Sequence, residues 1–135
     1  MDINLGPAME IIAAATEKAK EINVPMVIAV VDSGGNLVAQ HRMDGALLVS
    51  IEIALNKAYT AVAVQMPTHE LSKAAQPRQP LFGIHNTQGG RIIIFGGGFP
   101  LQRDGKIMGG IGVSGGSVEE DIQCATAGLN QFENK

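Results

Sequence analysis

The stretch Gly109-Gly110-Ile111-Gly112-Val113-Ser114-Gly115-Gly116-Ser117, followed by Val118-Glu119-Glu120-Asp121, decides the architecture predicted for this chain. An apolar run enters the glycines, which predicts a strand over residues 107–113. Ser117 and Glu120 have the spacing of a capping box, so a helix is expected to begin just after Ser117. Backbone N–H groups at such a helix start lack intrahelical partners, which makes this turn a candidate binding site.

The other elements follow from apolar periodicity and turn residues. A continuous β-branched run predicts a strand buried on both faces over 26–31, and the turn residues 32–36 lead into a second strand over 37–42. Asp104-Gly105 is a strong hairpin signal. The remaining expected elements are helices over 4–22 capped by Asn4, from 43–46 to about Val64 capped by Asp44, over 67–71 and over 118–131, and strands over 92–95 and 99–102.

These elements give the order α-β-β-α-α-β-β-β-α within a single domain spanning residues 1–135. Tight hairpins imply an antiparallel sheet covered by helices, so we expect an α+β fold with one sheet of about five strands flanked by helices. Residues 76–90 carry two prolines and three glycines without a clear period. A loop this long in a small domain is usually functional or held by a partner.

Composition excludes several classes of protein. The chain has 135 residues, 45% hydrophobic and 17% charged, with a formal net charge of −3, which is typical of a globular protein. No block of Lys or Arg provides a surface for nucleic acid or an anionic membrane. The N-terminus lacks the basic region of a signal peptide, and the apolar runs are shorter than the ~20 residues of a membrane helix. We therefore expect a cytoplasmic protein.

Residues 112–116 match the G-x-S-x-G pattern of a hydrolase nucleophile on a strand–turn–helix. That fold places its acid and then its histidine after the serine. The three histidines here, His41, His69 and His85, all precede Ser114. We therefore reject nucleophilic serine chemistry as the interpretation of this motif.

On residue chemistry alone, two interpretations of the glycines in 109–116 stand about even. They could cradle a phosphate or carboxylate, although no Gly-Lys-Ser/Thr follows to make a P-loop. They could instead let the strand end pack tightly against a helix or another subunit. Residues 96–100, Gly-Gly-Gly-Phe-Pro, form a second glycine-rich bend. If the sheet places the two bends side by side, they would line one cleft.

Three charged residues can be explained either by a function or by the fold alone. Lys57 is either a buried cation for an anionic ligand or a helix-surface lysine whose stem packs on apolar neighbours. Asp44 and Asp121 fit helix N-termini without any further function. The histidine spacings fit no zinc motif, and the absence of C-x-x-C-H excludes covalent haem attachment. The single cysteine, Cys124, is expected in the core.

A set of motifs in fixed order resembles the GlcG/HbpS family, which also includes the C-terminal domain of PduO-type corrinoid adenosyltransferases. The resemblance covers nearly the whole chain. The motifs are Val30-Val31-Asp32-Ser33-Gly34-Gly35, Arg42-Met43-Asp44-Gly45-Ala46, Lys57-Ala58, Gly97-Gly98-Phe99-Pro100, Gly110-Ile111-Gly112-Val113-Ser114-Gly115-Gly116 and Glu120-Asp121.

The resemblance implies a five-stranded antiparallel sheet with flanking helices, assembled into homo-oligomers that are often octamers. Some members bind haem, and stand-alone members accompany glycolate, glycerol and propanediol utilisation genes. Adenosyl transfer belongs to the other domain of PduO-type proteins and is not implied for this chain. Secreted HbpS-like members carry an export signal that this sequence lacks. The haem ligand differs among members, and His41, beside the Arg-Met-Asp-Gly motif, is the candidate we single out.

The leading hypothesis is a non-enzymatic, oligomeric binding protein for a haem-like or corrinoid-like tetrapyrrole, accessory to a diol, glycerol or glycolate pathway. The propionates or phosphate of such a ligand would suit helix N-termini and Arg42 or Lys57. The alternative is an enzyme acting on a small hydroxy acid, aldehyde or diol-derived metabolite, with Asp44, Lys57 or Asp121 as acid–base groups. A third hypothesis is an assembly partner for another protein. The residues assigned to binding are His41, Arg42, Asp44, Lys57, Gly97, Gly98, Pro100, Ser114, Gly115 and Asp121, and none is assigned a catalytic role.

Overall fold

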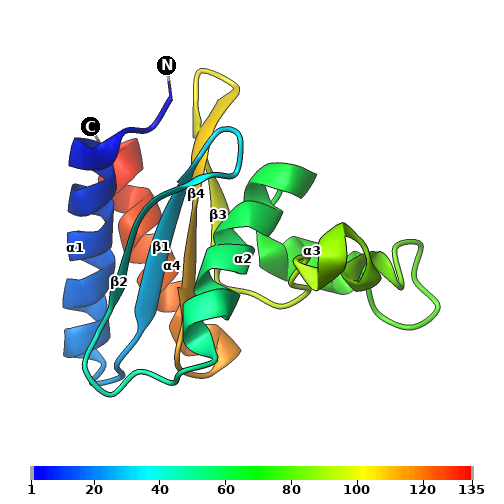
Figure 1. Cartoon of the computed structure of the whole chain (residues 1–135), viewed down its shortest axis with the longest axis horizontal. Helices are drawn as coiled ribbons and strands as arrows, with labels where there is room; N and C mark the ends of the chain where they lie inside the picture. The colour runs from blue at the N-terminus through cyan, green and yellow to red at the C-terminus, as the bar shows by residue number, and fades with distance from the viewer. Residues whose placement is uncertain (1, 135) are drawn as a thin grey trace.

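The computed structural model describes residues 2–134 as a sheet covered by helices on both faces. The helices are α1 (Leu5–Glu21), α2 (Ser50–Val64), α3 (Thr68–Ala74) and α4 (Val118–Glu133), and the strands are β1 (Val27–Asp32), β2 (Leu37–Arg42), β3 (Gly98–Arg103) and β4 (Lys106–Ser114). The helices α1 and α4 pack together on one face of the sheet, and α2 covers the other (Figure 1). The α+β class is therefore confirmed.

The sheet has the order β2-β1-β4-β3, and every neighbouring pair is antiparallel. The two central strands, β1 and β4, carry side chains to both faces. Ile28 and Val30 of β1, with Ile111 and Val113 of β4, join α1 and α4 in the main core. Val27 and Ala29 form a smaller cluster with Ala54 of α2 on the opposite face. This alternation explains why the β1 sequence is continuously apolar.

The expected fifth strand over 92–95 is wrong, because the sheet of the described residues has four strands. The Ile93 N–H donates to the Thr60 hydroxyl of α2 at 3.0 Å, and the Arg91 carbonyl accepts from the same hydroxyl at 3.2 Å. This apolar run is therefore held by α2 and not by a neighbouring strand. A short apolar run does not distinguish these two environments in sequence.

Glycine forms the α2-facing side of β4. A Cβ at Gly110 would lie 2.6 Å from the Ala58 carbonyl oxygen, and one at Gly112 would collide with the Ala54 carbonyl oxygen. The backbone of α2 therefore rests directly on the strand. The glycines of β4 therefore allow tight packing of the strand against a helix of the same chain, as one of the two interpretations predicted.

Several element ends differ from those expected. The helix expected to open at 43–46 begins at Ser50, its N-cap is Val49, and Asp44 is exposed in the preceding turn. Asn4 occupies the N-cap position of α1, but its side chain makes no capping bond. The helix expected over 67–71 extends to Ala74.

Other local expectations are confirmed. The Ser117–Glu120 capping box is present, with bonds of 3.2 and 2.8 Å. Asp104 and Gly105 both have positive φ in the β3–β4 turn, as the hairpin signal requires. The loop over 76–90 contains two short 3-10 turns, Ile84–Asn86 and Gln88–Gly90. Within residues 2–134, no helix combines the length and apolar character needed to span a membrane.

Candidate functional site

A buried ion pair joins α2 to α4 across the end of the sheet. The Lys57 ammonium lies 2.9 Å from the Asp121 carboxylate, and their side chains are 0% and 5% exposed. The same ammonium donates to the Val113 carbonyl at 2.8 Å. Small neighbours on α2, Ala54, Ala58 and Ala61, bring the helix close enough to the sheet for the lysine stem to be enclosed. Of the two interpretations of Lys57, the structure shows the buried cation, and its partner belongs to the chain.

The Asp121 carboxylate also closes the glycine-rich turn. Its second oxygen accepts from the Gly116 N–H at 2.9 Å. The backbone N–H groups that made this turn a candidate anion site therefore face a carboxylate of the chain's own helix. Lys57 supplies the counter-charge.

Burial and partners act on this pair in opposite directions. Desolvation lowers the pKa of the Lys57 ammonium, and the Asp121 charge works against that change. Desolvation raises the pKa of the Asp121 carboxyl, while Lys57 and the N–H groups of Gly116 and Gly115 oppose the rise. A buried charge of this kind is tolerated only when it is paired and hydrogen-bonded.

The second glycine-rich bend makes room for the ammonium. Gly97 has φ of +121°, and a Cβ there would lie 2.7 Å from the Lys57 Nζ atom and 2.7 Å from the Val113 carbonyl oxygen. Gly98 pairs with Gly112 in the sheet, and its N–H donates to the Thr68 hydroxyl at 2.9 Å. The two glycine-rich bends therefore lie side by side, but neither of the cavities described in this structure is lined by a residue of either bend.

An aromatic ring stands over this arrangement. The Lys57 Nζ atom lies 5.1 Å from the centroid of the Phe95 ring, within the range of a cation–π contact. Phe95 is itself 39% exposed, whereas both side chains of the ion pair are almost fully buried. The two cavities described in this structure have no lining residue in common with the pair.

The remaining predicted site residues divide into two groups. Ser114 is buried, and its hydroxyl donates to the Ser50 hydroxyl at 3.0 Å, while Gly115 adopts φ of +154° beside Pro25. Pro100 is buried on β3, opposite Gly110. These residues belong to the packed end of the sheet.

His41, Arg42 and Asp44 lie apart from the ion pair and are exposed. Arg42 pairs with Val27, which pairs in turn with Ser114, so Arg42 lies two strands from Ser114 at the same end of the sheet. Adjacent strands are about 4.8 Å apart, which puts the two backbones roughly 10 Å apart. Among the groups proposed for acid–base catalysis, the structure brings Lys57 and Asp121 together but leaves Asp44 outside.

Two histidines carry a feature that the sequence did not reveal. The Nδ1 atoms of His69 and His85 are buried without a hydrogen-bond partner within residues 2–134. His69 lies edge-on to Phe99, with ring centroids 5.5 Å apart, and its Nε2 atom is 3.6 Å from the Glu70 carboxylate. His85 lies edge-on to Phe82 at 6.0 Å, within the loop over 76–90. The length of that loop was the signal in the sequence.

Comparison with known proteins identifies the family. A family model described as haem degrading protein HbpS-like matches residues 3–130. The chain belongs to the HbpS-like family. An uncharacterized 15.0 kDa protein in the dhaT-dhaS intergenic region of Citrobacter freundii is 48% identical over 130 residues, which cover 96% of this chain and 92% of that protein. The expected GlcG/HbpS membership and relation to PduO are confirmed.

The names of two further similar proteins mention a corrinoid or haem. The corrinoid adenosyltransferase PduO of Citrobacter freundii is 43% identical over 129 residues, and the match covers 96% of this chain but 38% of PduO. The chain thus corresponds to just over a third of that enzyme's length. A solved structure of a PduOC:heme complex superposes with a TM-score of 0.93 at 41% identity, covering 97% of this chain and 95% of that chain.

Proposed function

We propose that this protein binds haem. The observation that carries the proposal is the solved PduOC:heme complex, whose fold matches this chain over 97% of its length. The description of the matching family model also names haem. A fold this similar can present equivalent surfaces to the same ligand.

Haem requires an axial donor beside exposed apolar surface, and the loop over 76–90 offers both. His85 is half-buried, and its Nδ1 atom is buried without a partner among the described residues, so Nε2 is the nitrogen that would bind iron. Beside it, Phe82 is 59% exposed and Leu81 is 39% exposed. Imidazole is the commonest protein ligand of haem iron, and iron bound this way would supply redox or gas-binding chemistry. We therefore assign His85 as the leading candidate ligand and retain His41 as the alternative.

The propionate partner is more restricted than the sequence indicated. Lys57 is fully buried and its ammonium is committed to Asp121, so it does not reach a propionate in this conformation. Arg42 is exposed and stays available. Of the two basic residues first considered, Arg42 is therefore the one we propose as a propionate partner.

A titration of haem-free protein with haemin, followed by the haem absorption bands, tests these assignments. We expect saturable binding by the wild type, weakened at least tenfold in His85→Ala and unchanged in His69→Ala, whose ring packs on Phe99. His41→Ala serves as the second ligand test. Loss of binding in His41→Ala with normal binding in His85→Ala would contradict the assignment to His85.

We further propose that the protein self-associates. Leu47, Leu48 and Val49 are consecutive and are 59%, 80% and 60% exposed. Exposed apolar runs of this kind mark interaction surfaces. The substitution Leu48→Glu is expected to reduce the mass measured by light scattering. An unchanged mass would contradict this use of the surface.

We also propose a cytoplasmic role accessory to glycolate, glycerol or diol utilisation. The support is the relation to PduO and to the dhaT-dhaS intergenic protein. A corrinoid is the second candidate ligand, since PduO is a corrinoid adenosyltransferase. Titration with cobalamin beside haemin separates the two, and saturable binding of cobalamin alone would replace haem by a corrinoid.

A further inference from the structure

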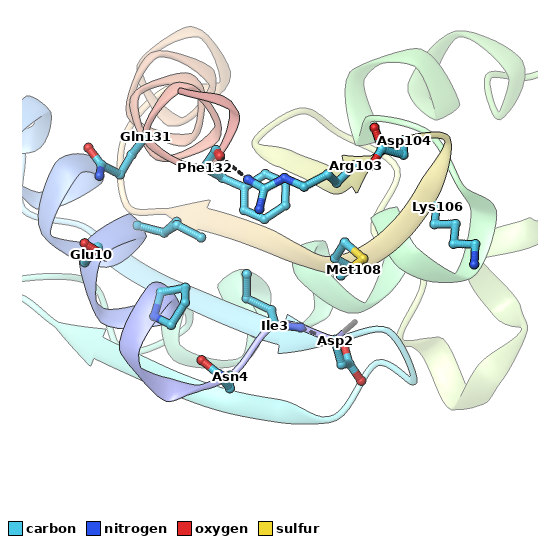
Figure 2. Close-up of a pocket in the computed structure, with 12 residues that line it drawn as sticks. Asp2, Ile3, Asn4, Glu10, Arg103, Asp104, Lys106, Met108, Gln131 and Phe132 are labelled. Atoms are coloured by element: carbon cyan, nitrogen blue, oxygen red, sulfur yellow. Dashed lines mark hydrogen bonds between the residues drawn. The ribbon is translucent and has the colours of Figure 1, made fainter. Parts of the chain in front are cut away.

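A cavity of about 480 Å³ opens between the N-terminal segment, the last turn of α4 and the β3–β4 hairpin (Figure 2). Its volume falls within the ~300–1,000 Å³ typical of small-molecule sites. Ile3, Ile11 and Phe132 give it an apolar lining and are 7%, 1% and 6% exposed. None of the residues assigned to binding from the sequence lines this cavity.

One basic side chain of the β3–β4 hairpin, that of Arg103, meets this apolar lining. The Arg103 guanidinium lies 4.3 Å from the centroid of the Phe132 ring and donates to the Phe132 carbonyl at 2.6 Å (Figure 2). An arginine has five N–H donors, so most of them are left after this bond. Lys106 lies directly opposite Arg103 in the strand register. Among residues 2–134, neither forms an ion pair with a carboxylate.

The wall of the cavity is fixed by the N-terminal segment. The Asp2 carboxylate accepts from the Ser33 N–H at 2.8 Å and from the Ser33 hydroxyl at 3.0 Å. These bonds hold the pKa of Asp2 below its usual range, and its carboxylate points away from Arg103 (Figure 2). Glu10 and Asp104 add two further carboxylates to the lining. The Ile3 N–H donates to the Met108 carbonyl at 3.0 Å, which fastens the same segment to β4.

We propose that this cavity binds a small molecule with an apolar body and a carboxylate, the carboxylate on Arg103 and the body against Ile3, Ile11 and Phe132. A guanidinium stacked on an aromatic ring is pre-oriented for a planar anion. The chemistry is shared by a free monocarboxylic acid and by a haem propionate. The site does not depend on whether this protein binds haem through His85.

Octanoate is the probe for this proposal. Calorimetric titration of the full chain is expected to show saturable binding, with octan-1-ol and octylamine much weaker. Arg103→Gln is expected to weaken octanoate binding about ten- to a hundred-fold, the range for a lost charge-assisted hydrogen bond. Arg103→Lys should restore part of the affinity. Lys73→Gln is the matched control, because Lys73 is an exposed lysine on α3.

Arg103→Lys keeps the proposal testable if Arg103→Gln is unstable, because it retains the positive charge but loses the planar guanidinium, and it is expected to weaken octanoate binding several-fold. Octanoate competing with haemin would identify the natural carboxylate as a propionate, and independent binding would identify a free acid; both support the site. Absence of saturable octanoate binding, equal affinity for octan-1-ol, or full affinity in both Arg103 variants would overturn it. Haem binding is measured separately by absorption, so its failure would not be confused with this one.

Discussion

The Lys57 ammonium and the Asp121 carboxylate lie 2.9 Å apart and connect α2 and α4, which pack on opposite faces of the sheet. The pair occupies the end of β4, where the glycine-rich turn places its N–H groups. The Gly116 N–H of this turn is thus hydrogen-bonded by a side chain of the same protein.

Removing one member of this pair is expected to be costly. Lys57→Met leaves the Asp121 charge buried without its partner, which should lower the free energy of unfolding by about 3–5 kcal/mol. The double variant Lys57→Met/Asp121→Asn should lose less than the sum of the two single changes. Urea denaturation of all four proteins measures this coupling. Single-variant losses that simply add would show that the two groups do not stabilise each other.

The space at Gly97 gives a second prediction. Gly97→Ala introduces a Cβ between the Lys57 Nζ atom and the Val113 carbonyl, at a φ of +121°. We expect a loss of at least about 1–3 kcal/mol, the cost of backbone strain alone. Gly6→Ala is the matched control, because nothing lies within 4 Å of its Cβ position. Equal thermal midpoints for Gly97→Ala and wild type would contradict the close approach.

The thiol of Cys124 should be unreactive in the folded protein. Cys124 is fully buried, and burial raises the pKa of its thiol to about 11. Because the thiolate is the reactive form, a thiol reagent at pH 8 should modify the native protein far more slowly than the urea-unfolded protein. Similar rates in both states would show that this part of the core opens readily.

The capping box at α4 predicts a smaller effect. Ser117→Ala removes the hydroxyl that accepts from the Glu120 N–H, which should cost about 1 kcal/mol. Ser117→Gly should lower the free energy of unfolding by only a few tenths of about 1 kcal/mol. Thermal unfolding of both variants measures the difference, and an equal loss in both would point to some role other than capping.

Local signals in the sequence identified most of the fold. The β-branched run of β1, the Asp104-Gly105 turn and the Ser117–Glu120 box each depend on neighbouring residues, so they were predicted correctly. Residues 92–95 were assigned to a strand because their apolar character does not reveal that α2, through Thr60, is their partner. Asp44 is a residue type that often caps helices, and it was therefore expected to cap this one. In the folded chain the helix begins only at Ser50.

The candidate site was predictable only in part. The sequence predicted that the glycine-rich bends at 96–100 and 109–116 would meet only if the sheet placed them side by side, and the pairing of Gly98 with Gly112 does so. The pairing of Lys57 with Asp121 joins residues 64 positions apart through a helix and a turn, which no local pattern encodes. His85 and the cavity beside Arg103 depend on how the loop and the terminal segment pack. The length of the loop was the only signal in the sequence for either of them.

The proposal that this protein binds haem is tested most directly by titrating the purified, haem-free protein with haemin and recording the haem absorption bands. We predict a saturable change with a defined stoichiometry, which His85→Ala weakens at least tenfold. Spectra that remain those of free haemin at every ratio would contradict the proposed function.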